Sequence, residues 1–408
     1  MKTQNQMTCK IKKVVAVIFG GVSPEHDVSI LTGLQVIEAI DASLFEVIPV
    51  YIDQNGEWWN GRELLDRKNY HFSEETKKKL NKIQLDIGRP FKDRPFFSVE
   101  KKTVFSRNKI IFFDVAFLAL HGAGGESGQI QGIFEIAGTP YTGPRSSTAS
   151  IWMNKSLSKK LSKESKIKVL PEIILKKTMR NSCLKSGEIL KNSKLSFPVC
   201  VKPCNLGSSI CVFKAKNETE LCSAVLEIFK IDVEVLIEPF VENLIEYNVS
   251  ITKSLSGEVE LSAIESPEKN DDLLSFEDKY LFKEGAESKL SIPLYEGIVL
   301  ASRDLNPQLT GDQRKFIEES AQKFFHLTAG TGAPRIDFLS NRRSKEIWFN
   351  EINPIPGSIG YYLWEARNKR IGFTQLTTSL INEAFSEKEK IFESNTDLSS
   401  FNASIFPK

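Results

Sequence analysis

The residues best placed to do chemistry form two triplets in the C-terminal third of the chain. Arg335-Ile336-Asp337 lies on one predicted strand, and Glu351-Ile352-Asn353 lies on the next. Because alternate side chains of a strand share a face, the outer residues of each triplet point the same way. If the two strands pair, three oxygen-bearing side chains converge with one arginine. Oxygen ligands of this kind suit Mg²⁺ bound together with nucleotide phosphates, whereas an ion-paired strand surface is the structural alternative.

Two further segments offer groups for an oxyanion or a phosphate. Pro354–Ser358 is a rigid turn that directly follows the second triplet and can present the Gly357 N–H to an oxyanion. Lys202 ends the apolar strand 197–202 and precedes the small-residue loop 205–209. An ammonium beside hydroxyls and backbone N–H groups predicts a phosphate site, although lysines at strand ends and Gly-Ser turns are also common. The Walker pattern GxxxxGK[ST] is absent from the sequence.

Two islands in the first half of the chain suit small charged ligands. Gly20–Asp27 separates the first predicted strand from the first helix and places Glu25 where a substrate ammonium can bind. His121 ends a strand and precedes the glycine-dense turn 122–128. The structural alternatives are a helix-capping acid for Glu25 and a hydrogen-bonded turn histidine for His121.

These segments need a scaffold of alternating strands and helices. Strand, glycine-rich turn and helix follow one another in the first third, which is typical of an open α/β sheet with ligands at the strand C-termini. Residues 53–108 are polar and lysine-rich and are expected to form a surface insertion, and a partly ordered tail is expected from about Ser386. The expected strands are 14–19, 45–52, 115–120, 197–202, 235–238, 246–252, 334–338 and 347–351, and the expected helices are 28–40, 311–327, 373–384 and one that begins within 131–136.

Composition excludes several classes of function. Lys+Arg 54 against Asp+Glu 52 leaves a net charge of +2, which provides no global field for nucleic acid or an anionic membrane. No stretch of about 18 apolar residues is present to span a bilayer. The four histidines form no HExxH motif, and the six cysteines lack paired zinc-ligand spacing, so reduced structural thiols are expected. The apolar run after Lys12-Lys13 is short and lacks a cleavage site, so a first strand and a cytoplasmic location are expected.

Taken in order, eight motifs resemble the D-alanine–D-alanine ligase branch of the ATP-grasp superfamily. They are Phe19-Gly20-Gly21…Glu25-His26-Asp27-Val28-Ser29, Ala119-Leu120-His121-Gly122…Gly125-Glu126-Ser127-Gly128…Gln131-Gly132, Met153-Asn154-Lys155, Val201-Lys202-Pro203…Gly207-Ser208-Ser209, Val235-Leu236-Ile237-Glu238, Lys279-Tyr280, Arg335-Ile336-Asp337 and Asn350-Glu351-Ile352-Asn353. Each motif alone is a weak signal. Eight in register, over about residues 14 to 385, are highly specific.

The resemblance implies a three-domain ATP-grasp architecture with an open α/β N-terminal domain. The expected divisions are an N-terminal substrate-binding domain at 1–150, a central ATP-grasp subdomain at 151–241, a C-terminal catalytic domain at 242–386 and a tail at 387–408. The implied activity is ATP-dependent ligation of two D-alanines through a D-alanyl phosphate, for peptidoglycan precursors. ATP, D-alanine and Mg²⁺ (two ions, replaceable by Mn²⁺) are the implied ligands, and a homodimer is expected, with no nucleic-acid or membrane partner.

The resemblance also implies a role for each motif residue. Nucleotide binding is implied for Lys155, Lys202, Ser209 and Lys279, with Glu238 and the Val241 backbone at the adenine and Glu246 at the ribose. Metal binding is implied for Asp337, Glu351 and Asn353. Glu25 takes the first ammonium in a set with Ser208 and Tyr280, Arg335 and the Gly357 N–H stabilise the oxyanion, and His121, Ser358 and Tyr362 complete the substrate site.

The sequence departs from the family pattern where the second substrate is expected. The stretch 357–364 replaces the one whose serine normally binds the acceptor's carboxylate, and ungapped alignment places Tyr362 there, with Ser358 as a neighbouring substitute. Cys211 stands where the family usually has glycine, and Pro334 removes one backbone donor from a predicted strand.

Formation of D-alanyl-D-alanine is the leading hypothesis. The alternatives are a sibling ligase with another acceptor, such as D-lactate, D-serine or a different amino acid, and a nucleotide-binding paralogue without ligase activity. Retention of both lysines and all three presumed metal ligands argues against the paralogue.

Overall fold

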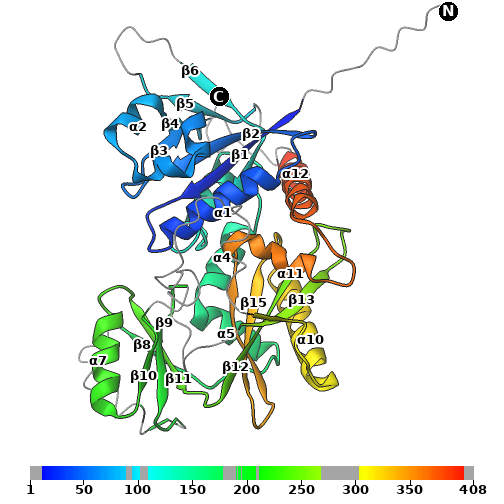
Figure 1. Cartoon of the computed structure of the whole chain (residues 1–408). Helices are drawn as coiled ribbons and strands as arrows, with labels where there is room; N and C mark the ends of the chain where they lie inside the picture. The colour runs from blue at the N-terminus through cyan, green and yellow to red at the C-terminus, as the bar shows by residue number, and fades with distance from the viewer. Residues whose placement is uncertain are drawn as a thin grey trace, which may run out of the picture.

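The computed structural model describes residues 12–88, 94–101, 109–177, 190, 192–193, 195–207, 211–267 and 303–398. Within these ranges the chain forms three sheets with helices packed on them (Figure 1). The first sheet is drawn at the top of Figure 1, and the two smaller sheets lie side by side below it. The α/β fold class expected from the alternation of strand and helix signals is therefore confirmed.

The first sheet is built around β1 (Lys13–Gly20), which pairs in parallel with β2 (Phe45–Ile52) and with β7 (Val115–Leu118). The run Val15–Phe19 is completely buried, as expected for a parallel strand covered on both faces. Helix α1 (His26–Ala39) follows β1 after the turn 21–25, and α3 (Gln129–Ile136) follows β7 after the glycine-dense turn. Both turns therefore open at the C-terminal end of a strand.

Residues 53–108 extend this sheet, so the expectation of a surface insertion is wrong for much of that segment. Three strands of the segment, followed by a fourth that begins just after it, pair antiparallel in succession beyond β2, and Trp59 and Phe97 contribute to the same core. The strands are β3 (Trp58–Asn60), β4 (Asn81–Leu85), β5 (Phe96–Val99) and β6 (Lys109–Phe112), and the short helices between them are η1 (Arg62–Leu65), η2 (Arg67–His71) and α2 (Glu74–Lys79).

The second and third sheets are antiparallel and follow one another along the chain. The second has the order β10-β9-β11-β8, and the third has the order β14-β13-β12-β15-β16. Their strands are β8 (Ile173–Lys176), β9 (Val199–Pro203), β10 (Phe213–Ala215), β11 (Glu234–Pro239), β12 (Leu244–Thr252), β13 (Glu260–Pro267), β14 (Arg303–Leu305), β15 (Arg335–Asn341) and β16 (Ile347–Asn353). Helix α7 (Glu218–Ile228) packs on the second sheet, and α4 (Ser146–Met153), α5 (Lys155–Glu164) and α10 (Gly311–Leu327) contact the third.

The C-terminal segment returns to the first sheet. After β16 come η3 (Gly357–Gly360), α11 (Tyr361–Glu365) and α12 (Phe373–Leu398). Leu376, Leu380 and Ile381 of α12 belong to the same buried core as the β1 strand. Helix α12 also continues to Leu398, so the expected tail at 387 begins as helix rather than as loosely ordered chain.

Two expectations from composition can be compared with the structure. None of the helices formed by the described residues is long and apolar enough to cross a membrane. Cys200, Cys204 and Cys211 are free thiols. Cys222 is disulfide-bonded, so the expectation that the thiols are all reduced is wrong at this position.

Candidate active site

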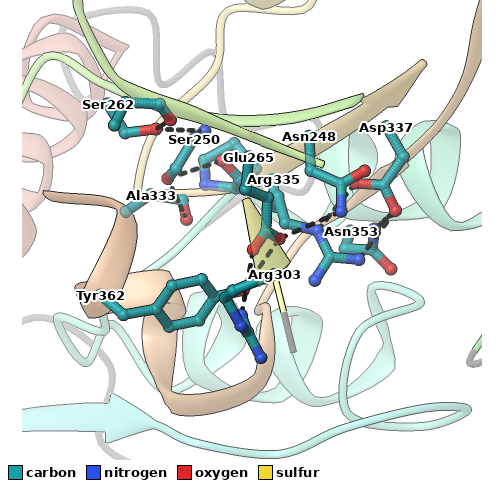
Figure 2. Close-up of polar contacts among 12 residues, drawn as sticks. Asn248, Ser250, Ser262, Glu265, Arg303, Ala333, Arg335, Asp337, Asn353 and Tyr362 are labelled. Carbon is teal, nitrogen blue, oxygen red and sulfur yellow. Dashed lines mark hydrogen bonds and ion pairs between the residues drawn. The ribbon is translucent and has the colours of Figure 1, made fainter. Parts of the chain in front are cut away.

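The two triplets predicted to converge lie on the neighbouring strands β15 and β16. Arg335 is opposite Asn353 and Asp337 is opposite Glu351 in the antiparallel register. The Arg335 guanidinium donates two hydrogen bonds to the Asp337 carboxylate, Nε to Oδ1 at 2.7 Å and Nη2 to Oδ2 at 2.8 Å. Asn353 Nδ2 donates to Asp337 Oδ2 at 3.0 Å (Figure 2). Pro334 lies just before the strand, where its missing N–H removes no bond from within the ladder.

The side chains of this strand pair fit a divalent metal of the Mg²⁺ type. Asp337 and Glu351 carry carboxylates and Asn353 carries an amide oxygen, which are hard oxygen donors. Each carboxylate is paired with a cation. Arg335 binds Asp337, and Lys155 Nζ lies 3.0 Å from Glu351 Oε2. Among the described residues, no group of three or more His, Cys, Asp and Glu side chains is placed to hold a metal. Any ion bound here would therefore depend on two carboxylates and other oxygen donors.

Lys202 is held by a buried acid on the next strand of the second sheet. Its Nζ lies 2.7 Å from Glu238 Oε1 and donates to Asn350 Oδ1 at 2.9 Å, so it bridges the second sheet and β16. The Glu238 carboxylate also contacts Lys159 of α5. Burial alone would raise the pKa of Glu238, but the two ammonium groups outweigh it and lower the pKa to about 2. Burial would likewise lower the pKa of Lys202, yet Glu238 raises it above its ordinary value.

Lys155 reaches the same region from the first turn of α5. Its ammonium donates to the Leu206 carbonyl at 2.5 Å and pairs with Glu351. Two lysines from different elements thus point toward the strand pair that carries the presumed metal ligands. Glu246 lies on β12 opposite Leu339 and is half-buried, and Val241 lies in the short link between β11 and β12. Their assignments to ribose and adenine remain predictions.

Glu25 lies against the glycine-dense turn 122–128. It is buried, it precedes α1, and its side chain makes no capping bond to that helix, so the capping alternative does not hold. A Cβ at Gly122 would lie 2.6 Å from Glu25 Oε2, and the Gly122 φ of +75° also disfavours other residues. A Cβ at Gly207 would lie 3.4 Å from the same oxygen. Three segments that are distant in the sequence therefore meet at one carboxylate.

Glu126 is a second buried acid here, and sequence reasoning gave it no role. Its Oε2 accepts from the Gly122 N–H at 2.7 Å, and its Oε1 accepts from the Ile355 N–H at 2.9 Å. Burial and the nearby charge of Glu25 raise its pKa to about 8. Glu126 thus ties the glycine-dense turn after β7 to the turn that precedes Gly357. Its place in the motif Gly125-Glu126-Ser127 was the available signal.

His121 and Ser358 are joined through Thr32. His121 Nε2 lies 2.8 Å from Thr32 Oγ1, and the Ser358 N–H donates to the same hydroxyl at 3.1 Å. Burial lowers the pKa of His121 to about 4, so the ring is neutral at physiological pH. Ser358 has φ +53° and Ile359 has φ +55°, a left-handed conformation that is costly for a β-branched residue. The Ser358 hydroxyl is buried without a hydrogen-bond partner among the described residues.

The Tyr362 side chain, predicted to bind substrate, makes contacts within the protein. Its hydroxyl donates to Glu265 Oε1 at 3.1 Å, and its ring stacks under the Arg303 guanidinium (Figure 2). Sequence reasoning missed Glu265 and Arg303, as it missed Lys159, because none of them lies in a motif. Gly357 begins the η3 turn directly after Pro356. The predictions for Ser208, Ser209, Lys279 and Tyr280 lie outside the described residues.

Comparison with known proteins supports one family over nearly the whole chain. Residues 14–144 match the family model described as D-ala D-ala ligase N-terminus, and residues 161–382 match the D-ala D-ala ligase C-terminus. A D-alanine--D-alanine ligase of Thermosipho melanesiensis is 31% identical over 94% of this chain and 97% of that protein. The Staphylococcus epidermidis protein of the same name is 30% identical over 93% of this chain and 98% of its own length.

Solved structures agree on the fold. The D-alanine-D-alanine ligase from Coxiella burnetii superposes with a TM-score of 0.77 at 22% identity, covering 96% of this chain and 99% of that one. The VanG D-Ala:D-Ser ligase from Enterococcus faecalis gives a TM-score of 0.72 at 26% identity, covering 92% of this chain and all of that one. The similar solved structures thus include one named for a different second amino acid.

Proposed function

The chain belongs to the D-alanine–D-alanine ligase family, and from this premise we propose that it joins two D-alanines in an ATP-dependent reaction. The observation that carries the proposal is the β15–β16 pair, where Asp337, Glu351 and Asn353 meet Arg335 and Lys155. An acyl-phosphate ligase needs an oxygen-rich metal site beside cations for phosphate, and the side chains of this strand pair and its neighbours are of the types that both require, which supports the proposal.

The proposed nucleotide site lies between the second and third sheets. Lys155 and Lys202 are assigned to the phosphates, and Glu238 and the Val241 backbone to the adenine, with Glu246 at the ribose. The buried pairing of Glu238 with Lys202 supports a fixed position for that lysine. Mg²⁺ is assigned to the two carboxylates and the amide of the strand pair, with two ions expected and Mn²⁺ able to replace them. When bound, the metal neutralises phosphate oxygens during transfer.

We propose that both carboxylates exchange partners when metal and nucleotide bind. Asp337 is now held by Arg335, and Glu351 is held by Lys155. Loss of those pairs frees the guanidinium for an oxyanion and the ammonium for phosphate. The same two carboxylates and two cations, rearranged, would supply the charges that the reacting complex needs.

A free carboxylate is a poor acyl donor, because an oxide ion would have to leave, so ATP must first phosphorylate it. A carboxylate oxygen of the first D-alanine takes the terminal phosphoryl group of ATP, which releases ADP. The amine of the second molecule then attacks the carbonyl carbon, a C–N bond forms, the C–O bond to phosphate breaks, and the amine proton passes to solvent. We assign Glu25 to the first ammonium and Arg335 with the Gly357 N–H to the tetrahedral oxyanion.

A sibling ligase with another acceptor is the second candidate. The observation that favours it is the Tyr362 hydroxyl, which is engaged by Glu265 in the segment expected to hold the acceptor. The likeness to a D-Ala:D-Ser ligase structure is in keeping with a different acceptor. We also propose a homodimer in the cytoplasm whose product enters peptidoglycan synthesis.

Phosphate release from ATP tests the proposal, first with D-alanine alone and then with a panel of amino acids and hydroxy acids. Strict dependence on D-alanine, with D-alanyl-D-alanine as the product by mass spectrometry, is the expected result. A product formed only with another acceptor would replace the first candidate by the second. ATP binding without any turnover would overturn both and leave a non-catalytic nucleotide-binding protein.

A further inference from the structure

A second polar cluster lies beside Arg335, formed by Glu265 of β13, Arg303 of β14 and Tyr362 of α11. Arg303 Nη1 donates to Glu265 Oε2 at 3.0 Å, and the Tyr362 hydroxyl donates to Glu265 Oε1 at 3.1 Å. The guanidinium carbon of Arg303 lies 4.2 Å from the centroid of the Tyr362 ring. In Figure 2, Glu265 lies between this arginine–tyrosine pair and the group that contains Asp337.

These contacts fix the orientation of the Arg303 guanidinium. One of its edges is bound by a buried carboxylate and one of its faces is covered by an aromatic ring, an arrangement that suits the planar fork of arginine and not the point charge of lysine. Glu265 is itself anchored, because Asn248 Nδ2 donates to its Oε1 at 3.1 Å. The side chain of Arg303 keeps 12% of its surface exposed, whereas that of Glu265 keeps 2%, so the arginine is the member of the pair that a small ligand can reach.

The position of Arg303 matches a requirement of the second half-reaction. The amine and the carboxylate of an α-amino acid are attached to the same carbon. When the amine attacks an acyl group held by Arg335, the acceptor's carboxylate must therefore lie only a few ångströms from that arginine. Arg303 is close enough to Arg335 for the two charges to repel each other. Arg335 is assigned to the oxyanion and Lys155 to the nucleotide, which leaves Arg303 as the neighbouring cation for a carboxylate.

We propose that Arg303 binds the carboxylate of the acceptor and selects acceptors that carry one. The inference rests on the proposed function, because it presupposes transfer of an acyl group to an amine or hydroxyl beside Arg335. The ligand class is an α-amino or α-hydroxy acid with a free carboxylate. Esters, amides and simple amines lack the group that the guanidinium recognises. Tyr362 and Glu265 act as positioning residues that hold the guanidinium in place.

A competition between D-alanine and D-alaninamide as acceptors tests this assignment. Both draw on the same acyl phosphate, so the ratio of dipeptide to dipeptide amide, measured by mass spectrometry, is independent of how fast that intermediate forms. The wild-type protein is expected to favour the carboxylate strongly. Arg303→Gln is expected to lower the ratio by about 10- to 100-fold, the usual effect of losing a hydrogen bond to a charged group. If the acceptor panel identifies another acid, that acid and its amide replace the pair.

Arg367 offers a matched control. It too stacks on an aromatic residue of α11, with its guanidinium carbon 5.6 Å from the Trp364 ring, and it pairs with a β13 glutamate, Nη1 to Glu260 Oε2 at 2.9 Å. Arg367→Gln removes the same kinds of contact and is expected to leave the product ratio unchanged. A purely structural role for Arg303 predicts instead that both variants behave alike.

The outcomes distinguish failure of the Arg303 assignment from failure of the proposed function. An unchanged ratio in Arg303→Gln, or a wild-type protein without preference for the carboxylate, overturns the role of Arg303. Absence of any acyl transfer in the wild-type protein overturns the proposed function instead. Should Arg303→Gln fail to fold, Arg303→Lys decides the question, because it keeps the charge but loses the fork. A several-fold drop in its ratio supports the assignment, and a wild-type ratio overturns it.

Discussion

Replacing Glu238 by glutamine removes the negative charge that lies between two buried lysines. Lys159 and Lys202 would keep their positions but lose a common partner, and their side chains are only 1% and 6% exposed. Burial raises the pKa of Glu238 and the lysines more than reverse that effect, so the folded value is about 2 against an ordinary 4.5. A displacement of that size corresponds to about 3 kcal/mol, in the range found when one partner of a buried ion pair is removed.

The sign of the pH dependence follows from the lowered pKa. The folded protein holds the Glu238 carboxylate ionised to lower pH than the unfolded chain does. Its contribution is therefore fully present above the unfolded pKa of about 4.5 and is lost as the pH falls through about 2. The difference in unfolding free energy between wild type and Glu238→Gln is expected to be about 3 kcal/mol at pH 7 and to shrink below pH 4.5.

Urea denaturation followed by circular dichroism, together with calorimetry, measures this difference. Glu172→Gln is the matched control, because Glu172 Oε2 also contacts Lys159, at 3.5 Å, but burial raises the pKa of Glu172. That variant is expected to lose less than about 1 kcal/mol. The reasoning is refuted if Glu238→Gln is as stable as wild type at pH 7, or if Glu172→Gln loses as much.

Three further changes probe the site. Glu351→Gln is expected to abolish phosphate release through loss of metal while the variant stays folded by circular dichroism; full turnover would refute the metal assignment. Arg335→Lys replaces the fork on Asp337 by a point charge, and kcat is expected to fall at least about 100-fold in steady-state assays, so an unchanged kcat would exclude an oxyanion role. Because burial lowers the pKa of His121 from 6.5 to about 4, wild-type stability should decline by up to about 3 kcal/mol more than that of His121→Gln between pH 6.5 and 4; parallel pH profiles would contradict this.

The sequence predicts long apolar or amphipathic elements well. The strand Phe45–Ile52 and the helix Gly311–Leu327 are found at the expected residues. Their signals are local, since burial imposes a regular spacing of apolar residues along each element. The strands within 53–108 were missed because each has only three to five residues, too few to show a regular period, even where Trp59 and Phe97 reach the core.

In the candidate site, too, some residues can be predicted from the sequence and others cannot. The convergence of Arg335 and Asp337 with Glu351 follows from strand alternation and from the pairing of neighbouring strands, both of which can be anticipated. The partners that come from elsewhere cannot be anticipated by spacing. The Thr32 hydroxyl meets the Ser358 N–H across 326 residues, and Arg303 finds its carboxylate on another strand. Such contacts depend on how whole elements pack, which no local pattern in one sequence records.

The return of α12 to the first sheet has a consequence for biosynthesis. A ribosome makes β1 through β7 early, but Leu376, Leu380 and Ile381, which share their core, are among the last residues to emerge. Until then the nascent first sheet has part of its apolar surface uncovered, which invites aggregation or chaperone binding. A premature stop before Phe373 is therefore expected to yield insoluble chains rather than a weakened enzyme, even though such chains would keep Glu25, Arg335 and Glu351.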